Sequence, residues 1–147
     1  MRNIKYIVVH CTASSQKATA EQLLNEFKRK GWKSPGYHYV VTADGKIHQL
    51  LAEDKISNGV KGFNGISINI AYVGGIDNKG KAVDNRTPFQ KLSLRKLLAL
   101  MKKKYPQAVI QGHRDFSPDL NNDGKITPNE WLKGCPCFDA KAEYKDL

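Results

Sequence analysis

The sequence predicts a single α/β domain in which a central mixed β-sheet is flanked by helices. Two observations lead to this prediction. Short apolar runs typical of buried strands alternate along the chain with longer segments of helical periodicity. A tight-turn signal, Asp44-Gly45 between two apolar stretches, adds a hairpin and therefore an antiparallel pair of strands. Because we find no repeat, low-complexity tract or linker, we expect one domain over residues 1–147.

Each element has its own signal in the sequence. Runs rich in Val, Ile and Tyr predict strands at about residues 4–10, 36–42, 46–51, 66–73 and 108–112. Helices are expected from Thr19 to Gly31, from Thr87 to a point before Pro106, and briefly from Thr127. The first helix is predicted to open with a capping box of Thr19 and Gln22, and the second pairs Thr87 with Gln90 in the same way.

Composition describes a globular chain with a basic surface. Of the 147 residues, 40% are hydrophobic, and no apolar stretch approaches the ~20 residues of a membrane span. Lys and Arg number 24 against 14 Asp and Glu, and the net charge of +10 favours anionic partners such as nucleic acid, anionic lipid or a carboxylate-rich bacterial wall. No Lys/Arg block is long enough for a nucleic-acid arm. We therefore expect neither nucleic-acid binding nor membrane insertion. We also expect a monomer. A basic surface that has no specific partner is the alternative to attraction by an anionic partner.

The N-terminus and the cysteines bear on where the protein is made. The run IKYIVVH is too short for the apolar core of a signal peptide and leads directly into His10, which cleavage would remove. We expect synthesis in the cytoplasm without a signal peptide, and action on a target after release or export by another system. Cys11, Cys135 and Cys137 form no evident disulfide framework, and reduced thiols in such a protein suit metal binding or catalysis.

Three residues far apart in the chain are candidate ligands of one zinc ion. His10 ends the first expected strand, His113 follows the last, and Cys135 lies in KGCPCFD. Zinc prefers imidazole and thiolate, and three protein ligands leave a fourth position for water, as in catalytic sites. Functional sites in α/β sheets usually lie at the ends of strands. Both histidines are expected at such ends, and this position favours a shared site. Taken singly, a strand-end histidine is more often a hydrogen-bonded structural residue, and a lone cysteine a small buried hydrophobe.

Six segments occur in one order along the chain: VVHCTAS, SPGYHYVV, KGFNGISINIAYVGGIDNKGK, TPFQ, GHRD and KGCPCFD. Together they resemble the zinc-dependent N-acetylmuramoyl-L-alanine amidases of the phage-lysozyme type, relatives of the peptidoglycan-recognition proteins. The resemblance runs from Ile4 to about Asp139. It implies that family's fold, and hydrolysis of the amide bond between N-acetylmuramic acid and L-alanine in bacterial peptidoglycan. The chain departs from the phage-type pattern at Gly59, where some phage relatives carry a histidine, and in an insertion before Cys135.

The resemblance also implies roles for five residues. His10, His113 and Cys135 match the family's zinc ligands, Tyr37 its active-site tyrosine, and Lys133 the lysine two residues before the cysteine ligand. The implied mechanism is attack of a zinc-bound water on the lactyl carbonyl, since zinc lowers the pKa of water from about 15.7 toward 7. Zinc and the Lys133 ammonium would stabilise the oxyanion, and Tyr37 would hydrogen-bond the water or the oxyanion. A phage or prophage endolysin, which degrades the cell wall, fits these properties.

Other interpretations of the same residues stay open. The main alternative is a non-catalytic peptidoglycan-binding module, although relatives of that kind lack the cysteine ligand. A cysteine hydrolase is disfavoured because His10 and Cys11, as neighbours in a strand, point to opposite faces. The same alternation would turn His38 away from a site that Tyr37 faces, as a hydrogen-bonded core residue. A zinc deaminase needs H-x-E and P-C-x-x-C, whereas this chain has HCT and CPC.

The insertion predicts a second cation. Residues 119–130, DLNNDGKITPNE, match the calcium-loop pattern D-x-[DN]-x-[DN]-G-x₅-E at every specified position. The Ca²⁺ ligands would be Asp119, Asn121, Asp123, Lys125 through its carbonyl oxygen, and Glu130. A polar turn with a capping box from Thr127 to Glu130 is the rival interpretation, and the two are compatible because a calcium loop ends in a helix. Bound calcium would brace the segment that carries Lys133 and Cys135.

Overall fold

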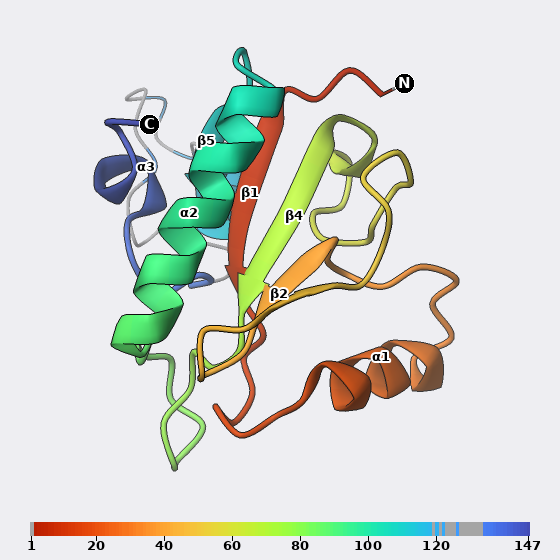
Figure 1. Ribbon diagram of the computed structural model, residues 1–147, viewed down its shortest axis with the longest axis vertical. Coiled ribbons are helices and arrows are strands. Elements are labelled where there is room, and N and C mark those ends of the chain that lie inside the picture. Colours follow the sequence, from red (N-terminus) through yellow and green to blue (C-terminus); the bar gives the residue numbers. More distant parts are fainter. Residues whose placement is uncertain (1, 119, 121, 123–125, 127–133) are drawn as a thin grey trace.

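The computed structural model describes residues 2–118, 120, 122, 126 and 134–147. Its five-stranded sheet has the order β3-β2-β4-β1-β5. The strands are β1 Tyr6–Cys11, β2 Tyr39–Val41, β3 Ile47–Gln49, β4 Ser67–Tyr72 and β5 Val109–Gly112. Strand β1 pairs in parallel with β4 and β5, β2 pairs in parallel with β4, and β3 is antiparallel to β2. The predicted mixed sheet and its hairpin are thus confirmed (Figure 1).

The helices begin where the capping signals place them. Helix α1 spans Ala20–Arg29, α2 spans Pro88–Lys104, and α3 spans Ala140–Glu143; two short 3₁₀ turns are η1 Asn64–Ile66 and η2 His113–Phe116. Both predicted capping boxes are present, with the Thr19 and Thr87 hydroxyls each accepting from the backbone N–H of the glutamine three residues later. The expected helix start at Thr127 lies outside the described residues. The single turn of α3 was not predicted, because four residues are too few to show a helical period.

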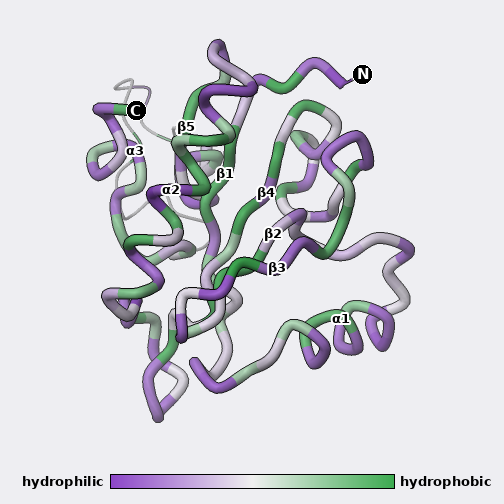
Figure 2. The backbone as a smooth tube through the Cα atoms, in the orientation of Figure 1, coloured by the Kyte–Doolittle hydropathy of each residue, from purple (hydrophilic) through white to green (hydrophobic). Residues whose placement is uncertain are grey.

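Strand alternation divides the core between the two faces of the sheet. The larger cluster lies toward α2 and includes Ile7, Val9, Ile68, Ile70, Leu94 and Leu98. A smaller cluster on the opposite face packs α1 against the sheet through Leu23, Phe27, Val40, Ala71 and Val73. Figure 2 shows the hydrophobic residues gathered along the central strands, with hydrophilic residues on the outer turns of the helices. Within the described part of the chain, none of the helices has the length and apolarity that a membrane span requires.

A buried arginine ties the C-terminal segment to the loop before α2. The Arg86 guanidinium donates to Asp84 at 2.9 Å and to Glu143 at 2.6 Å, and it lies 3.4 Å over the ring of Phe138. The hydrogen bond from Arg86 lowers the pKa of Glu143. These contacts fix the segment that follows Cys135 against the body of the sheet.

Candidate functional site

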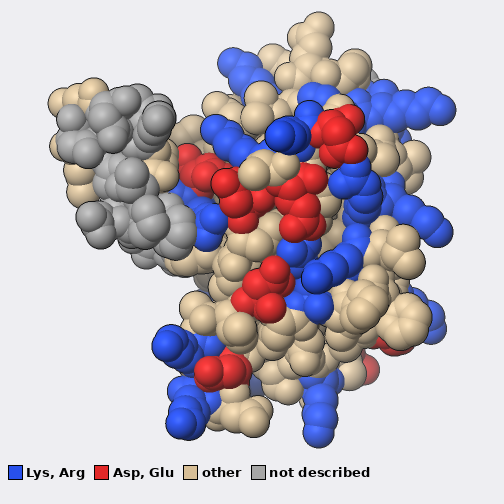
Figure 3. Space-filling model, turned by 90° about the vertical axis from the view of Figure 1, so that its left-hand side faces the viewer, with Lys and Arg blue, Asp and Glu red and all other residues tan. Residues whose placement is uncertain are grey.

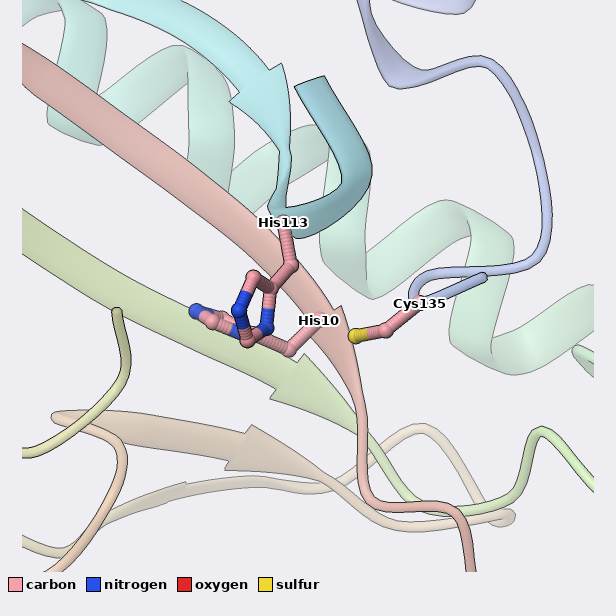
Figure 4. Close-up of side chains that lie close together, drawn as sticks. All are labelled: His10, His113 and Cys135. Carbon is pink, nitrogen blue, oxygen red and sulfur yellow. The ribbon is translucent and has the colours of Figure 1, made fainter. Parts of the chain in front are cut away.

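The three predicted zinc ligands meet at the carboxyl end of the sheet (Figure 4). Their ligand atoms all lie within 4.8 Å of one another. His10 is the buried penultimate residue of β1, and His113 directly follows β5. Because Val9 pairs with Gly112, the two histidines are side by side, with ring centroids 5.0 Å apart. Figure 4 shows the side chains converging from β1, from the end of β5 and from the C-terminal segment.

The chemistry of this group fits a zinc ion. Two imidazoles and a thiolate are a donor set that zinc binds in catalytic sites. The backbone N–H of Cys11 donates to Cys135 Sγ at 3.0 Å, a contact that a metal-bound thiolate can accept. His10 Nε2 lies 2.8 Å from Asn69 Oδ1, so one ring nitrogen has a partner of the kind that orients metal-binding histidines.

Backbone contacts fix the position of Cys135. The N–H of Arg114 donates to the Cys135 carbonyl at 2.8 Å, which joins the C-terminal segment to η2. The Tyr72 hydroxyl donates to the Pro136 carbonyl at 2.7 Å from the buried side of β4. A Cβ at Gly112 would lie 2.6 Å from Pro136 Cδ, so glycine at the end of β5 allows this close approach.

The three candidate ligands line a cleft with a volume of about 260 Å³. Its walls come from α1, from the loop after β1 and from the segment before β2. Stacked rings form part of one wall, since Phe27 and Trp32 lie 5.3 Å apart at an interplanar angle of 9°. A second hollow of about 410 Å³ adjoins the cleft and shares Trp32, Asn58, Gly59 and His113 with it.

Tyr37 lies beside His10 in this cleft. The two ring centroids are 5.1 Å apart, and the Tyr37 hydroxyl donates to the Cys11 carbonyl at 3.3 Å. Burial raises the pKa of the Tyr37 phenol above its usual range, so the group is a protonated donor at neutral pH. Lys133 and the calcium-loop residues Asp119, Asn121, Asp123, Lys125 and Glu130 lie outside the described residues.

His38 is buried and hydrogen-bonded as predicted, but it does not point away from the site. Strict alternation does not apply at Tyr37 and His38 because β2 begins only at Tyr39. His38 Nε2 lies 2.7 Å from the Lys55 carbonyl, and its Nδ1 accepts from the backbone N–H of Asn69, the residue that contacts His10. Burial lowers the pKa of His38.

Sequence reasoning missed Asn69, which lies in the middle of β4 with no exposed surface. The sequence did contain a signal, because Asn69 interrupts the apolar strand segment SINIAY. Asparagine is depleted in strands, and a buried amide requires hydrogen-bond partners. Its partner Ser57 was missed as well, because that serine comes from an irregular segment far from β4 in sequence.

A mixed α/β sheet with a His-His-Cys centre in a cleft defines a candidate metal-dependent hydrolase. The family model of N-acetylmuramoyl-L-alanine amidase (Amidase_2) matches residues 1–130, and the chain belongs to this family. The endolysin of Klebsiella phage KP32 is 37% identical over 139 residues, which cover 92% of this chain and 82% of that protein. The predicted family and enzyme class, an N-acetylmuramoyl-L-alanine amidase acting on peptidoglycan, are thereby confirmed.

Solved structures show the same fold. The Ph2119 endolysin from Thermus scotoductus MAT2119 bacteriophage Ph2119 is 30% identical, with a TM-score of 0.70 over 92% of this chain and 79% of that one. Bumblebee PGRP-SA is 14% identical and has a TM-score of 0.70 over 100% of this chain and 86% of its own. This second likeness concerns the fold alone, and it matches the architecture that the sequence motifs implied.

Proposed function

We propose that the chain is a zinc-dependent amidase that cleaves the bond between the lactyl group of N-acetylmuramic acid and L-alanine, with His10, His113 and Cys135 as zinc ligands. The observation that carries this proposal is the convergence of the three ligand atoms within 4.8 Å of one another beside a cleft. Zinc bound there would act as a Lewis acid, polarising the scissile carbonyl and making water more acidic.

The residues around the centre would stabilise charge and orient the substrate. Tyr37 keeps its proton at neutral pH and can donate it in a hydrogen bond to the oxyanion that develops on the carbonyl. Its present bond to the Cys11 carbonyl is long, at 3.3 Å, so a substrate oxygen can replace that partner. On the sequence motif alone, we assign the Lys133 ammonium to the same oxyanion.

The surroundings of the cleft suit a peptidoglycan fragment. Trp32 and Phe27 offer an aromatic surface on which apolar parts of a sugar or peptide can pack. Lys30 lines the cleft together with Glu26, 3.9 Å away, and Lys61 lines the adjoining hollow. Carboxylates of a stem peptide would therefore meet positive charge from both lysines, which Glu26 partly offsets at Lys30.

We further propose that the amidase domain spans residues 1–147. The family match ends at residue 130, whereas Cys135 lies within the ligand group. The similarity to phage endolysins supports lysis of the cell wall as the role. We propose that the protein acts as a monomer that reaches the wall after release or export.

Calcium binding at residues 119–130 is proposed from the loop pattern in the sequence. Calorimetry on zinc-loaded protein in chelator-treated buffer is expected to show one Ca²⁺ site, and the absence of any calcium heat would reject it. The ion would brace the segment before Cys135 and take no part in the chemistry.

The central experiment incubates purified sacculi with the protein, with and without a zinc chelator. We expect release of new L-alanine amino termini, loss of this activity on chelation, and recovery when Zn²⁺ is added back. Activity that persists after complete zinc removal would overturn the metal dependence. Binding to sacculi without any release of amino termini would favour the non-catalytic binding module instead.

A further inference from the structure

Behind His10, a row of buried polar side chains leads from the candidate metal centre into the protein. Asn69, Ser57 and His38 each have 0% exposure. His10 Nε2 lies 2.8 Å from Asn69 Oδ1, and Asn69 Nδ2 lies 2.7 Å from Ser57 Oγ. Ser57 Oγ in turn lies 3.1 Å from His38 Nδ1. Burial of four polar side chains is unfavourable unless each is hydrogen-bonded, so the direction of every bond matters.

Backbone groups at the inner end of this row decide which atoms donate. The N–H of Asn69 can only donate, and it lies 3.0 Å from His38 Nδ1, so that nitrogen is the acceptor. His38 Nε2 therefore carries the hydrogen and donates to the Lys55 carbonyl at 2.7 Å. The Arg2 guanidinium also lies 3.1 Å from Nε2, but it can only donate and so makes no hydrogen bond to this nitrogen in that tautomer. Burial, together with the nearby Arg2 cation, lowers the pKa of His38, which keeps the ring neutral with one donor and one acceptor.

The same direction carries through to the metal centre. The Ser57 hydroxyl donates to His38 Nδ1 and shares the single lone pair of that nitrogen with the Asn69 backbone N–H, while Ser57 Oγ accepts from the Asn69 Nδ2 group. The Asn69 amide is thereby oriented with Oδ1 toward His10. Because an amide oxygen only accepts, His10 Nε2 carries the hydrogen, and the lone pair of the ring lies on Nδ1.

A glycine leaves room for this arrangement. A Cβ at Gly59 would lie 2.3 to 2.6 Å from three atoms of the Asn69 side chain, closer than real Cβ contacts. The Asn69 amide therefore fills the space that a side chain at position 59 would need.

We propose that Asn69 is a positioning residue of the metal centre, which holds His10 as the Nε2–H tautomer so that Nδ1 binds the metal. This inference rests on the proposed zinc function. The row from His38 to Asn69 orients the imidazole before any metal arrives. Partners that orient metal ligands in this way typically contribute about 10- to 100-fold in metal affinity.

The first test reads the tautomer directly, in metal-free protein, by ¹⁵N NMR of the histidine rings. We expect the His10 hydrogen on Nε2 in the unsubstituted protein and a mixture of tautomers in Asn69→Leu. Zinc affinity, measured by competition with a chelating indicator, should fall about 10- to 100-fold in Asn69→Leu. Asn69→Asp keeps an acceptor oxygen and should retain most of the affinity. Gly59→Ala leaves Asn69 in the sequence but displaces its amide, and should reproduce the loss.

Gln90→Leu is the matched control for the loss of a buried amide. Gln90 is fully buried on α2 and donates to the carbonyls of Val41 and Val73, so its replacement should lower stability and leave zinc affinity unchanged. If Asn69→Leu does not fold, the Gly59→Ala variant and the tautomer of the unsubstituted protein decide the question.

The outcomes separate this inference from the proposed function. If the unsubstituted protein binds zinc and the Asn69 and Gly59 variants bind it equally well, the positioning role is wrong while the zinc amidase stands. A hydrogen on Nδ1 of His10 in metal-free protein would also overturn it. If the unsubstituted protein neither binds zinc nor releases amino termini from sacculi, the proposed function itself fails.

Discussion

At the scale of single residues, the three cysteines lie close together at the end of β1, but their sulfur atoms have different surroundings. Cys135 Sγ accepts from the Cys11 backbone N–H at 3.0 Å and belongs to the ligand group. Cys137 Sγ lies 3.9 Å from Cys11 Sγ and 3.5 Å from the Gly75 carbonyl. The hydrogen bond with Cys11 and burial raise the pKa of the Cys137 thiol. A metal ligand must be a thiolate. Because Cys135 is the cysteine whose sulfur lies in the ligand group with His10 and His113, we expect it to bind zinc.

We predict that Cys135→Ser and Cys137→Ser have opposite consequences. Loss of a direct ligand should lower zinc affinity by more than about 100-fold, beyond the effect of losing an orienting partner, and abolish amidase activity. Cys137→Ser should retain both. Zinc content after gel filtration and release of L-alanine amino termini measure the two effects. Equal losses in both variants would mean that the thiol ligand has been assigned to the wrong residue.

The role of Tyr37 gives a second prediction at this scale. Tyr37→Phe removes the hydroxyl beside the centre and should lower kcat by about 10²- to 10³-fold, as expected for one oxyanion donor, with little change in KM. Tyr39→Phe is the control. The Tyr39 hydroxyl donates to Glu53 at a distance of 2.5 Å, and neither residue lines the cleft. A Tyr37→Phe enzyme with full kcat would exclude the donor role.

The sequence was informative about residues whose position follows from a strand end. His10 and His113 were placed correctly at the ends of two strands, and pairing of β1 with β5 then brought them together. Asn69 could not be predicted in the same way. Its role depends on Ser57 and His38, which reach it from separate segments, and which atom donates depends on backbone groups that only the folded chain aligns.

At the scale of elements, local signals were sufficient for the helix starts and insufficient for strand lengths. Capping boxes use residues three apart, so α1 and α2 begin as predicted. Strand β2 was expected at 36–42 but spans only Tyr39–Val41, because where pairing begins depends on its partners β3 and β4. The difference matters for the site, since it lets Tyr37 and His38 both face the side of the sheet on which His10 lies.

The attachment of α3 gives a prediction for a whole element. Arg86→Met removes the cation between Asp84 and Glu143 and leaves two partly buried carboxylates facing each other. Breaking a buried ion pair typically lowers the free energy of unfolding by about 3–5 kcal/mol. Because both acids are partly exposed, we expect a smaller loss of about 2–3 kcal/mol for Arg86→Met. Zinc affinity should fall too, because the segment carrying Cys135 loosens. Urea denaturation and indicator competition measure the two effects.

A surface ion pair is the control for this experiment. Arg95 pairs with Asp146 with side-chain exposures of 43% and 60%, so Arg95→Met should cost less than about 1 kcal/mol. If Arg86→Met costs no more than Arg95→Met, the buried pair does not anchor the C-terminal segment.

At the scale of the whole molecule, the net charge of +10 does not gather into one field on the face seen in Figure 3. Lys and Arg side chains there lie around a group of Asp and Glu. Such a distribution favours diffuse attraction to an anionic wall, which salt screens over about 8 Å at physiological ionic strength. It offers no continuous basic stripe on that face for a nucleic-acid backbone.

The pH dependence of stability is a property of the whole chain, and we predict two separate declines in acid. Burial lowers the pKa of His38 from its usual 6.5, so the unfolded chain binds a proton at this residue more readily than the folded one. The stability that depends on neutral His38 is fully present above pH 6.5 and is lost as the pH falls through the folded pKa.

The second decline belongs to the carboxylates around Arg86. The hydrogen bond from Arg86 lowers the pKa of Glu143 from 4.5, and in Asp84 the same cation outweighs the burial that would raise the pKa from 3.8. Their contribution is intact above those values and is lost only as the pH falls through the folded pKa values. Urea denaturation of metal-free protein from pH 8 to pH 3 should therefore show a first loss below about 6.5 and a steeper one below about 4. His38→Gln should remove the first loss of stability, and Arg86→Met should reduce the second. If the stability of His38→Gln still falls below about pH 6.5 as in the unsubstituted protein, another group causes the first loss.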